Sequence, residues 1–285
     1  MRSFVVTGTS SGIGRAVARQ LVDRGYRVFG MDVDGQGAAS LEAELGEFFV
    51  PLLGDITDPQ AVSRAVELVR KELDEEVLCG LVNSAGVLIY GPLFDAAPAD
   101  VRRQIEVDVM GTYNMMTAFA PLLGYRRPVP TAPGRIVNLS ALSARVPTPF
   151  FAAYGAANAA IEAMSRNLRS ELKLLGIEVV VVRSGVVKSN MMTDAKIYTD
   201  YADASPMRHA ILRFSQMYRD HVGQATGPER VAAKIIKVLT MADPKPLYTV
   251  ARRPVGDWLF PLLAPRAVID RLMVNNLKDR YDGRS

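Results

Sequence analysis

Short apolar runs alternate along the chain with longer stretches in which apolar residues recur every three or four positions. The runs are rich in valine, isoleucine and phenylalanine, as buried parallel strands are, and the stretches between them have the period of amphipathic helices. This alternation predicts an α/β Rossmann fold, a doubly wound parallel seven-stranded sheet with helices on both faces. The predicted strands are 4–6, 27–31, 48–52, 77–82, 135–139, 178–182 and 247–250.

One domain is expected over the whole chain, 1–285, because the alternation continues without a linker. Two segments depart from it. Residues at about 190–227 interrupt the pattern before the last strand and predict a lid that contains Met191, Met192 and Tyr198. A C-terminal apolar extension at about 254–285 carries the cluster 258–263, which either contributes to an apolar ligand site or packs against the body or a partner.

Composition excludes several classes of protein. The 285 residues are 49% apolar and carry a formal net charge of +4, with the arginines in scattered pairs, so nucleic-acid binding is not expected. A single cysteine, Cys79, no visible signal peptide and no apolar run of membrane-spanning length predict a cytoplasmic protein. His209 and His221 have no partners at ligand spacing, so no metal site is expected.

A glycine-rich turn joins the first predicted strand to a helix at about 12–24. Gly8 permits the tight turn, Gly12 lets the backbone approach a pyrophosphate, and Gly14 allows close packing of helix on strand. The free N–H groups and the positive end of the helix then face the phosphates. This strand-turn-helix context predicts a dinucleotide site that also includes Ser10, Ser11 and Ile13.

Asp32 ends the second predicted strand. A carboxylate there accepts hydrogen bonds from the adenosine ribose and repels a 2′-phosphate. No basic residue stands between Gly8 and Gly12. The predicted cofactor is therefore NAD or NADH.

Further motifs resemble the short-chain dehydrogenase/reductase family over about residues 3 to 250. The loop 7–14 matches the family's TGxxxGxG, and Gly134–Ser140 resembles the strand before its catalytic serine. The resemblance implies cofactor contacts at Asp55, Ile56, Asn83, Ala85, Gly86, Tyr154, Gly185 and Ser189.

The departures from the family fall at its catalytic tetrad of Asn, Ser, Tyr and Lys. The corresponding residues are Asp108, Ala141, Tyr154 and Asn158, so only the tyrosine, the family's proton donor or acceptor, is retained. Tyr154 and Asn158 are four residues apart on one helix face. A lysine cation about 5 Å away is worth about 3 kcal/mol at an effective dielectric of about 20. Its absence predicts that Tyr154 is a poor base near neutral pH.

Three nearby residues are candidates to compensate for the missing groups. Ser143 has the strand parity of Ala141, and Lys188 or Arg145 would supply a cation. Each is also compatible with an ordinary loop residue.

Three functions stay open at this point. The first is an oxidoreductase acting on a carbonyl or hydroxyl of a hydrophobic small molecule, with weak or rearranged chemistry around Tyr154. The second is a non-redox isomerase, lyase or cyclase with Asp108 and Tyr154 as its acid/base pair. The third is a catalytically silent subunit or NAD sensor. The resemblance implies a homodimer or homotetramer, or a hetero-oligomer with an active subunit of the same family.

Overall fold

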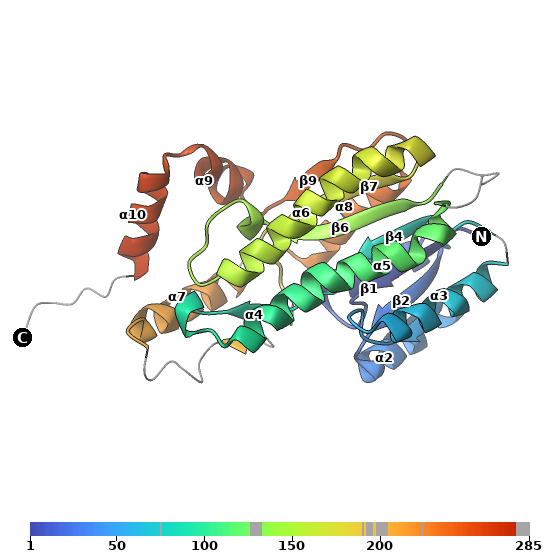
Figure 1. Cartoon of the computed structure of the whole chain (residues 1–285), viewed down its shortest axis with the longest axis horizontal. Coiled ribbons are helices and arrows are strands. Elements are labelled where there is room, and N and C mark those ends of the chain that lie inside the picture. The colour runs from blue at the N-terminus through green and yellow to red at the C-terminus, as the bar shows by residue number, and fades with distance from the viewer. Residues whose placement is uncertain are drawn as a thin grey trace, which may run out of the picture.

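The apolar runs form a seven-stranded sheet in which every neighbouring pair of strands is parallel, in the order β3-β2-β1-β4-β6-β7-β9 (Figure 1). The predicted sheet is confirmed. The computed structural model describes residues 1–74, 76–125, 133–189, 191, 196–197, 205–223 and 225–277. The strands are β1 (Ser3–Thr7), β2 (Arg27–Asp32), β3 (Phe49–Leu53), β4 (Gly80–Asn83), β6 (Arg135–Ala141), β7 (Glu178–Ser184) and β9 (Leu247–Val250).

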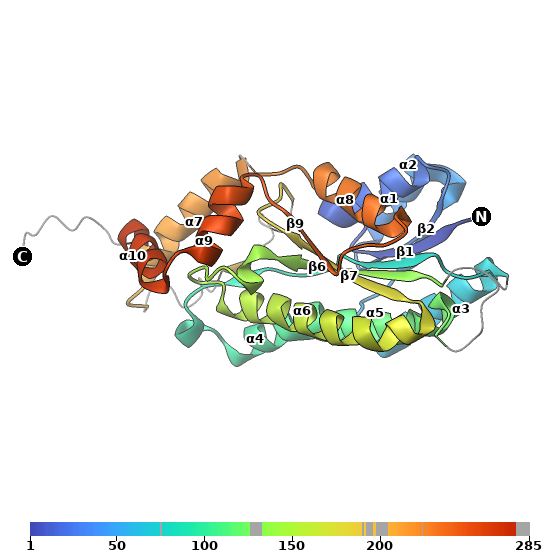
Figure 2. The same cartoon turned by 90° about the horizontal axis from the view of Figure 1, so that it is seen from above.

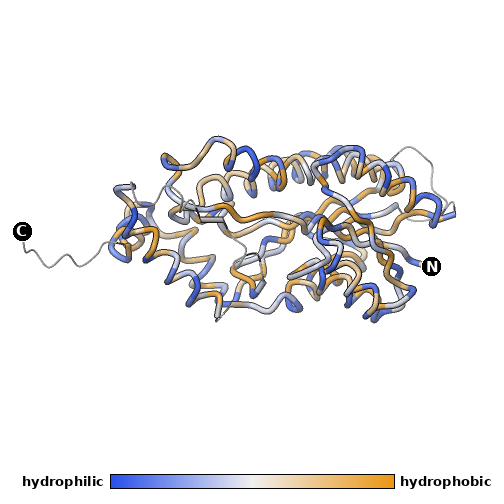
Figure 3. Tube along the Cα trace, turned by 90° about the horizontal axis from the view of Figure 1, so that it is seen from below, coloured by the Kyte–Doolittle hydropathy of each residue, from blue (hydrophilic) through white to orange (hydrophobic). Residues whose placement is uncertain are grey.

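Helices cover both faces of this sheet, as the alternation predicts (Figure 2). Helices α1, α2 and α8 lie on one face, and α3, α4, α5 and α6 lie on the other. Each face has its own apolar cluster of buried residues, and Figure 3 shows hydrophobic residues running through the middle layer of strands. The helices are α1 (Gly12–Val22), α2 (Gly35–Leu45), α3 (Pro59–Leu73), α4 (Pro98–Ile105), α5 (Thr112–Phe119), α6 (Ala152–Leu172), α7 (Arg208–Gly223), α8 (Pro228–Thr240), α9 (Phe260–Leu263) and α10 (Arg266–Leu277).

Two local features differ from the predicted elements. Strand β4 begins at Gly80 instead of residue 77, because the N–H of Leu78 donates to the carbonyl of Leu122 at a helix end and not to a strand. A second, two-stranded parallel sheet pairs β5 (Ile89–Tyr90) with β8 (Lys196–Ile197). Strands of two residues have no readable period, so the pattern did not predict them.

The order of the strands reverses between β1 and β4. The connections from these two strands run in opposite directions along the sheet, which opens a crevice at their carboxyl ends. The glycine-rich turn follows β1 and the segment 84–86 follows β4, so both border that crevice.

The segments flanking β9 form further helices. Helix α7 lies within the predicted lid, whereas Met192 and Tyr198 lie outside the described residues. Beyond β9 come a π-helical turn, η9 (Pro254–Leu259), and then α9 and α10. No helix in the described part of the chain is long and apolar enough to cross a membrane.

Candidate active site

The glycine-rich turn has the backbone geometry that its glycines predict. Gly8 and Gly12 have φ angles of +74° and +54°, which side chains disfavour. A Cβ on Gly8 would lie 2.9 Å from the Cα of Ala85, and one on Gly14 would lie 2.1 Å from the carbonyl oxygen of Gly8. Gly14 therefore serves the packing of α1 on the turn, while Gly8 and Gly12 line the cavity.

The N-terminus of α1 is left without a side-chain cap. Ser11 stands at its N-cap but makes no capping hydrogen bond, whereas Asp34 and Asp58 cap α2 and α3 by accepting from backbone N–H groups. The first N–H groups of α1 thus stay available at the cavity wall formed by Ser11, Gly12 and Ile13. This is an arrangement that suits a phosphate group.

Two carboxylates define the far end of the cavity. Asp32 accepts from the N–H of Ser10 at 2.8 Å and from the N–H of Asp34 at 3.0 Å, so its charge is fixed beside the glycine-rich turn. Asp55 accepts from the N–H and the hydroxyl of Thr57, both at 2.8 Å, and pairs with Arg103. These hydrogen bonds lower the pKa of Asp55 and more than offset its partial burial.

One hydroxyl connects the segment after β4 to the end of β1, where the glycine-rich turn begins. Thr7 Oγ1 accepts from the N–H groups of Ser84 and Ala85, both at 3.0 Å. Ser189, in the loop after β7, approaches Gly12 closely, with its Cβ 3.2 Å from the position of a Cβ on that glycine. Three chain segments therefore converge around one space.

That space is a cavity of about 610 Å³. Every residue predicted to bind the cofactor lines it except Gly14, whose contacts are with the turn itself. The positive-φ glycines, the uncapped helix end and the two carboxylates fit a dinucleotide, with phosphates at Ser11–Ile13 and the adenosine toward Asp32 and Asp55. The lining residues named in the sequence analysis are Gly8, Ser10, Ser11, Gly12, Ile13, Asp32, Asp55, Ile56, Asn83, Ala85, Gly86, Asp108, Tyr154, Asn158, Gly185 and Ser189.

Tyr154 lies in the first turn of α6, at the end of the cavity opposite Asp32 and Asp55. Burial, followed by the Asp108 carboxyl and Tyr218, raises the pKa of Tyr154 above its ordinary value, and the Asn158 amide opposes this shift. Asn158 is buried and its Nδ2 donates to the backbone carbonyl of Tyr154 at 3.0 Å. The group in the lysine position thus supplies no cation, and Tyr154 keeps its proton near neutral pH.

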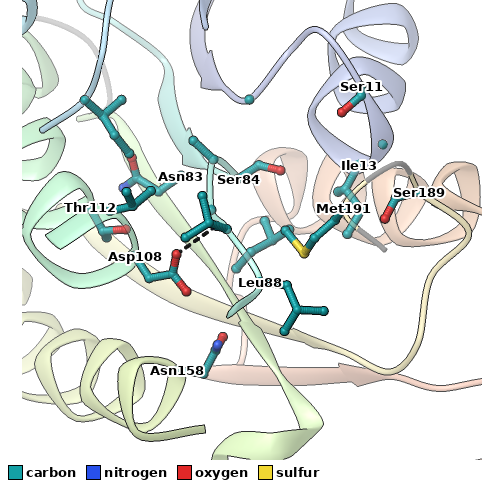
Figure 4. A pocket seen from close by; sticks show the side chains of 18 of the residues that line it. Ser11, Ile13, Asn83, Ser84, Leu88, Asp108, Thr112, Asn158, Ser189 and Met191 are labelled. Atoms are coloured by element: carbon teal, nitrogen blue, oxygen red, sulfur yellow. Dashed lines mark hydrogen bonds between the residues drawn. The ribbon is translucent and has the colours of Figure 1, made fainter. Parts of the chain in front are cut away.

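Asp108 lies in a π-helical turn, η3 (Glu106–Gly111), between α4 and α5. Its Oδ1 accepts from the N–H of Val87 at 3.0 Å, and its Oδ2 accepts from Gln104 Nε2 at 2.6 Å. Gln104 also donates to the carbonyl of Val87 and accepts from the N–H of Ile89, which fixes the orientation of its amide. Asp108 and Asn158 point into the same space, beside Leu88 (Figure 4). Burial raises the pKa of Asp108 to about 7, although both hydrogen bonds act to lower it.

This shift makes a prediction about stability. Because the folded state holds the Asp108 proton more tightly than the unfolded state, the contribution of this group is complete below pH about 4 and is lost as pH rises to about 7. The loss is at most ~4 kcal/mol in the free energy of unfolding. Asp108→Asn removes the titration but leaves one amide donor facing Gln104. We expect this variant to have a lower free energy of unfolding than wild type at pH 5, and we expect the difference between the two proteins to be smaller at pH 8.

Urea unfolding at both pH values measures this effect, with the exposed Asp243→Asn as the control. Parallel stability curves for wild type and Asp108→Asn would contradict the assignment.

The three candidates for compensation do not line the cavity. Strand β6 ends at Ala141 and the turn η5 (Leu142–Ala144) breaks the alternation, so Ser143 does not follow the parity of Ala141. The Ser143 Oγ is buried and has no hydrogen-bond partner among the described residues. Lys188 is exposed, and Arg145 pairs with Glu162.

A buried ionic cluster under α6 is not predicted from the sequence. Glu162 accepts from Arg183 through two bonds of 2.7 and 2.6 Å, from Ser140 at 2.9 Å and from Arg145 at 3.2 Å. The Arg183 hydrogen bonds and charge lower the pKa of Glu162 against the effect of its burial. Ser140 and Asn158 both line the cavity, so the cluster contacts the cavity wall through Ser140. Arg183, a charged residue in the valine-rich run of β7, is the feature of the sequence that could have indicated this cluster.

Aromatic side chains surround the Tyr154 end of the cavity. The ring of Phe151 lies 5.8 Å from that of Tyr154 and 5.4 Å from that of Phe214 on α7, both edge to face. Tyr218 stacks on Phe214 and lines the cavity together with Met191. By contrast, Leu259, Phe260, Leu262 and Leu263 are exposed and do not line it, and the Trp258 side chain lies outside the described set. The cluster 258–263 therefore does not form the described ligand cavity.

The fold and this site define a Rossmann-type protein whose cavity is suited to a dinucleotide, with Asp32 and Asp55 at one end and Tyr154 at the other. A profile described as "short chain dehydrogenase" matches residues 2–198. The chain belongs to the short-chain dehydrogenase family, whose members are oxidoreductases.

The relatives and solved structures agree with this assignment. The chain is 30% identical to "NADPH-dependent 3-dehydrocapnine reductase" of Ornithobacterium rhinotracheale, over 98% of both chains. It is 34% identical to human "Retinol dehydrogenase 5", over 94% of this chain and 86% of the relative. A short-chain dehydrogenase from Streptomyces avermitilis has the same fold, with a TM-score of 0.74 and 24% identity over 96% of this chain and 94% of its own.

Proposed function

We propose that the protein is an NAD(H)-dependent oxidoreductase that interconverts a carbonyl and a hydroxyl group on a hydrophobic small molecule. One observation carries the proposal. The residues suited to a dinucleotide and the hydroxyl of Tyr154 belong to a single cavity. When bound there, the nicotinamide supplies or accepts the hydride. In the reduction, hydride reaches the carbonyl carbon, the C=O π bond breaks, and Tyr154 gives its proton to the oxygen, which yields the alcohol.

Reduction is the direction that this site favours. A tyrosine whose pKa is raised is protonated near neutral pH, so the form that can give a proton to a carbonyl is present and the phenolate that would take one from an alcohol is scarce. Ala141 offers no hydroxyl to the reacting oxygen, and Asn158 offers no cation. We therefore expect slow turnover, with alcohol oxidation the weaker direction.

The aromatic and methionine side chains near Tyr154 support a hydrophobic substrate. Leu88, Met191 and Tyr218 line this end of the cavity, and such flexible and aromatic groups suit apolar ligands. The names of the two relatives, a 3-dehydrocapnine reductase and a retinol dehydrogenase, are compatible with carbonyl or hydroxyl chemistry.

Asp32 supports NAD as the cofactor, whereas the name of one relative includes NADPH. The carboxylate lies beside the glycine-rich turn, and Arg15, which donates to the carbonyl of Ser10, is paired with Glu44. Asp32→Ala removes both the ribose acceptor and the charge that repels a 2′-phosphate. We expect about 10- to 100-fold weaker NADH binding and a smaller preference over NADPH, since one hydrogen bond to a charged group is worth about 1.5–3 kcal/mol.

Calorimetric titration of both dinucleotides into wild type, Asp32→Ala and the exposed control Asp243→Asn tests this preference. Tighter binding of NADPH than NADH by wild type would overturn the cofactor proposal.

A second candidate rests on Asp108. A buried carboxyl with a pKa of about 7 beside a tyrosine suits a non-redox isomerase, lyase or cyclase, with the two as an acid/base pair. A catalytically silent subunit or NAD sensor would keep the cofactor site and need no chemistry at Tyr154. Transfer of isotope from NADH to a product separates both from the first proposal.

We further propose a cytoplasmic homodimer or homotetramer, or a hetero-oligomer with an active subunit of the family. Tyr113 on α5 and Met110 in η3 are exposed apolar groups on one helical layer. By contrast, Leu172 is buried against the sheet, and Met164 and Leu168 pack on the same cluster. Light scattering at micromolar concentration measures the assembly.

A further inference from the structure

The segment after β9 exposes an unusual amount of apolar surface. Between residues 255 and 274 it exposes more large apolar side chains than any other stretch of that length in the described chain. These side chains, which we call the C-terminal apolar surface, are Val255, Leu259, Phe260, Leu262, Leu263, Val268, Leu272 and Val274. So many exposed apolar side chains in one short segment favour contact with another apolar phase.

The C-terminal apolar surface stands at one end of the molecule. Figures 1 and 2 show α7, α9 and α10 together at the end away from α2 and α3. Ile269 is buried and Leu277 packs on the aromatic cluster that contains Phe151 and Phe214, so α10 is fixed to the body. Pro254, Pro261 and Pro265 interrupt the segment before α10 and restrict its backbone.

Exposed charges accompany the apolar side chains. Arg252, Arg253, Arg266 and Arg271 lie in or next to the segment, against two acidic residues, Asp257 and Asp270. Exposed apolar side chains next to an excess of arginine suit the interface of an anionic bilayer, where apolar groups enter the acyl region and arginines lie at the phosphate headgroups. A second copy of the chain is a poorer match, because its segment carries the same excess of arginine and so offers less complementary charge than an anionic bilayer does.

We propose that the C-terminal apolar surface docks on an anionic lipid bilayer, with Leu259, Phe260 and Leu263 inserted among the acyl chains and the arginines at the headgroups. The site lies at the end of the molecule where α7 covers the Tyr154 end of the cavity. The inference does not depend on the reaction that the cavity supports.

Vesicle flotation with the full chain tests the proposal. The probe is extruded phosphatidylcholine vesicles with about 30 mol % phosphatidylglycerol, compared with pure phosphatidylcholine. The chain has one tryptophan, Trp258, within this segment, so a blue shift of its fluorescence on adding vesicles is a second readout. We expect binding to the anionic vesicles, weakened by salt, and little binding to the neutral ones.

Three variants make the result specific. Leu259→Ser/Phe260→Ser/Leu263→Ser should weaken binding about 100-fold, from the loss of three inserted side chains. Arg266→Gln/Arg271→Gln should weaken it about 30-fold and reduce its salt dependence. Leu174→Ser/Leu175→Ser, which changes side chains 88% and 44% exposed in the turn η6 (Lys173–Leu175) after α6, is the matched control and should bind like wild type.

Failure of wild type to float with the anionic vesicles, or equal binding by the triple serine variant, would overturn the proposal. So would a wild-type dimer that the triple variant converts to a monomer by light scattering in the absence of lipid, because the surface would then be an interface between copies. Melting curves establish that each variant is folded, which these exposed positions favour.

Discussion

Tyr154→Phe should lower the rate of carbonyl reduction by about 10²–10⁴-fold, the usual contribution of a general acid. Tyr154 is the one member of the expected tetrad that the chain retains, and Asn158 and Ala141 supply no alternative proton. Removal of one hydroxyl leaves the ring against Phe151, so thermal stability should change little.

The matched control is Tyr218→Phe. Tyr218 lines the same cavity and its pKa is also raised by burial, but it lies on α7 and outside the tetrad. Initial rates with NADH and a panel of apolar ketones and aldehydes measure both variants. Equal losses in the two variants would mean that the aromatic cluster as a whole, and not the Tyr154 hydroxyl, supports the reaction.

The second large effect is on folding. Glu162→Ala should lower the free energy of unfolding by about 3–5 kcal/mol, because it removes the carboxylate from a buried ion pair. Glu162 and Arg183 are both buried, and their contact is bidentate. The same change also takes the acceptor from Ser140 in the wall of the cavity.

Urea unfolding at pH 7 measures this loss. The control is Glu67→Ala, which removes an exposed pair with Arg70 on α3 and should change stability by about 0.5 kcal/mol or less. The double variant Glu162→Leu/Arg183→Met should recover a large part of the loss, since it removes both buried charges and leaves only the half-exposed Arg145 without its Glu162 partner. A Glu162→Ala variant as stable as Glu67→Ala would show that the cluster does not hold α6 to β7.

The fold and the cofactor end of the site followed from local patterns. Valine-rich runs fix strands, and Gly8, Gly12 and Gly14 are required by backbone geometry that any strand-turn-helix of this kind shares. The strands and the glycine-rich turn both depend on residues that are close together in the sequence. For that reason the order of the elements and the lining of the cavity near Ser11 agree with expectation.

The catalytic end depended on contacts between distant segments, which a sequence pattern does not contain. Ser143 has the strand parity of Ala141, but β6 ends at Ala141, so this parity does not extend to Ser143. Gln104 orients Asp108 from one turn away along the same helical segment, a spacing that was available but carried no chemical signal by itself. The apolar cluster 258–263 was compatible with a ligand site, with packing or with a partner, and only the structure shows its exposure.

The proposed reaction is tested most directly by isotope transfer. Wild-type protein is incubated with NADH deuterated at both C4 positions and with apolar ketones and aldehydes, and the alcohol products are analysed by mass spectrometry. Our account predicts alcohol that carries one deuterium on the former carbonyl carbon, with far less formed by Tyr154→Phe. Measurable NADH binding with no deuterium in any product would contradict it, and would favour a non-redox enzyme or a silent dinucleotide-binding subunit.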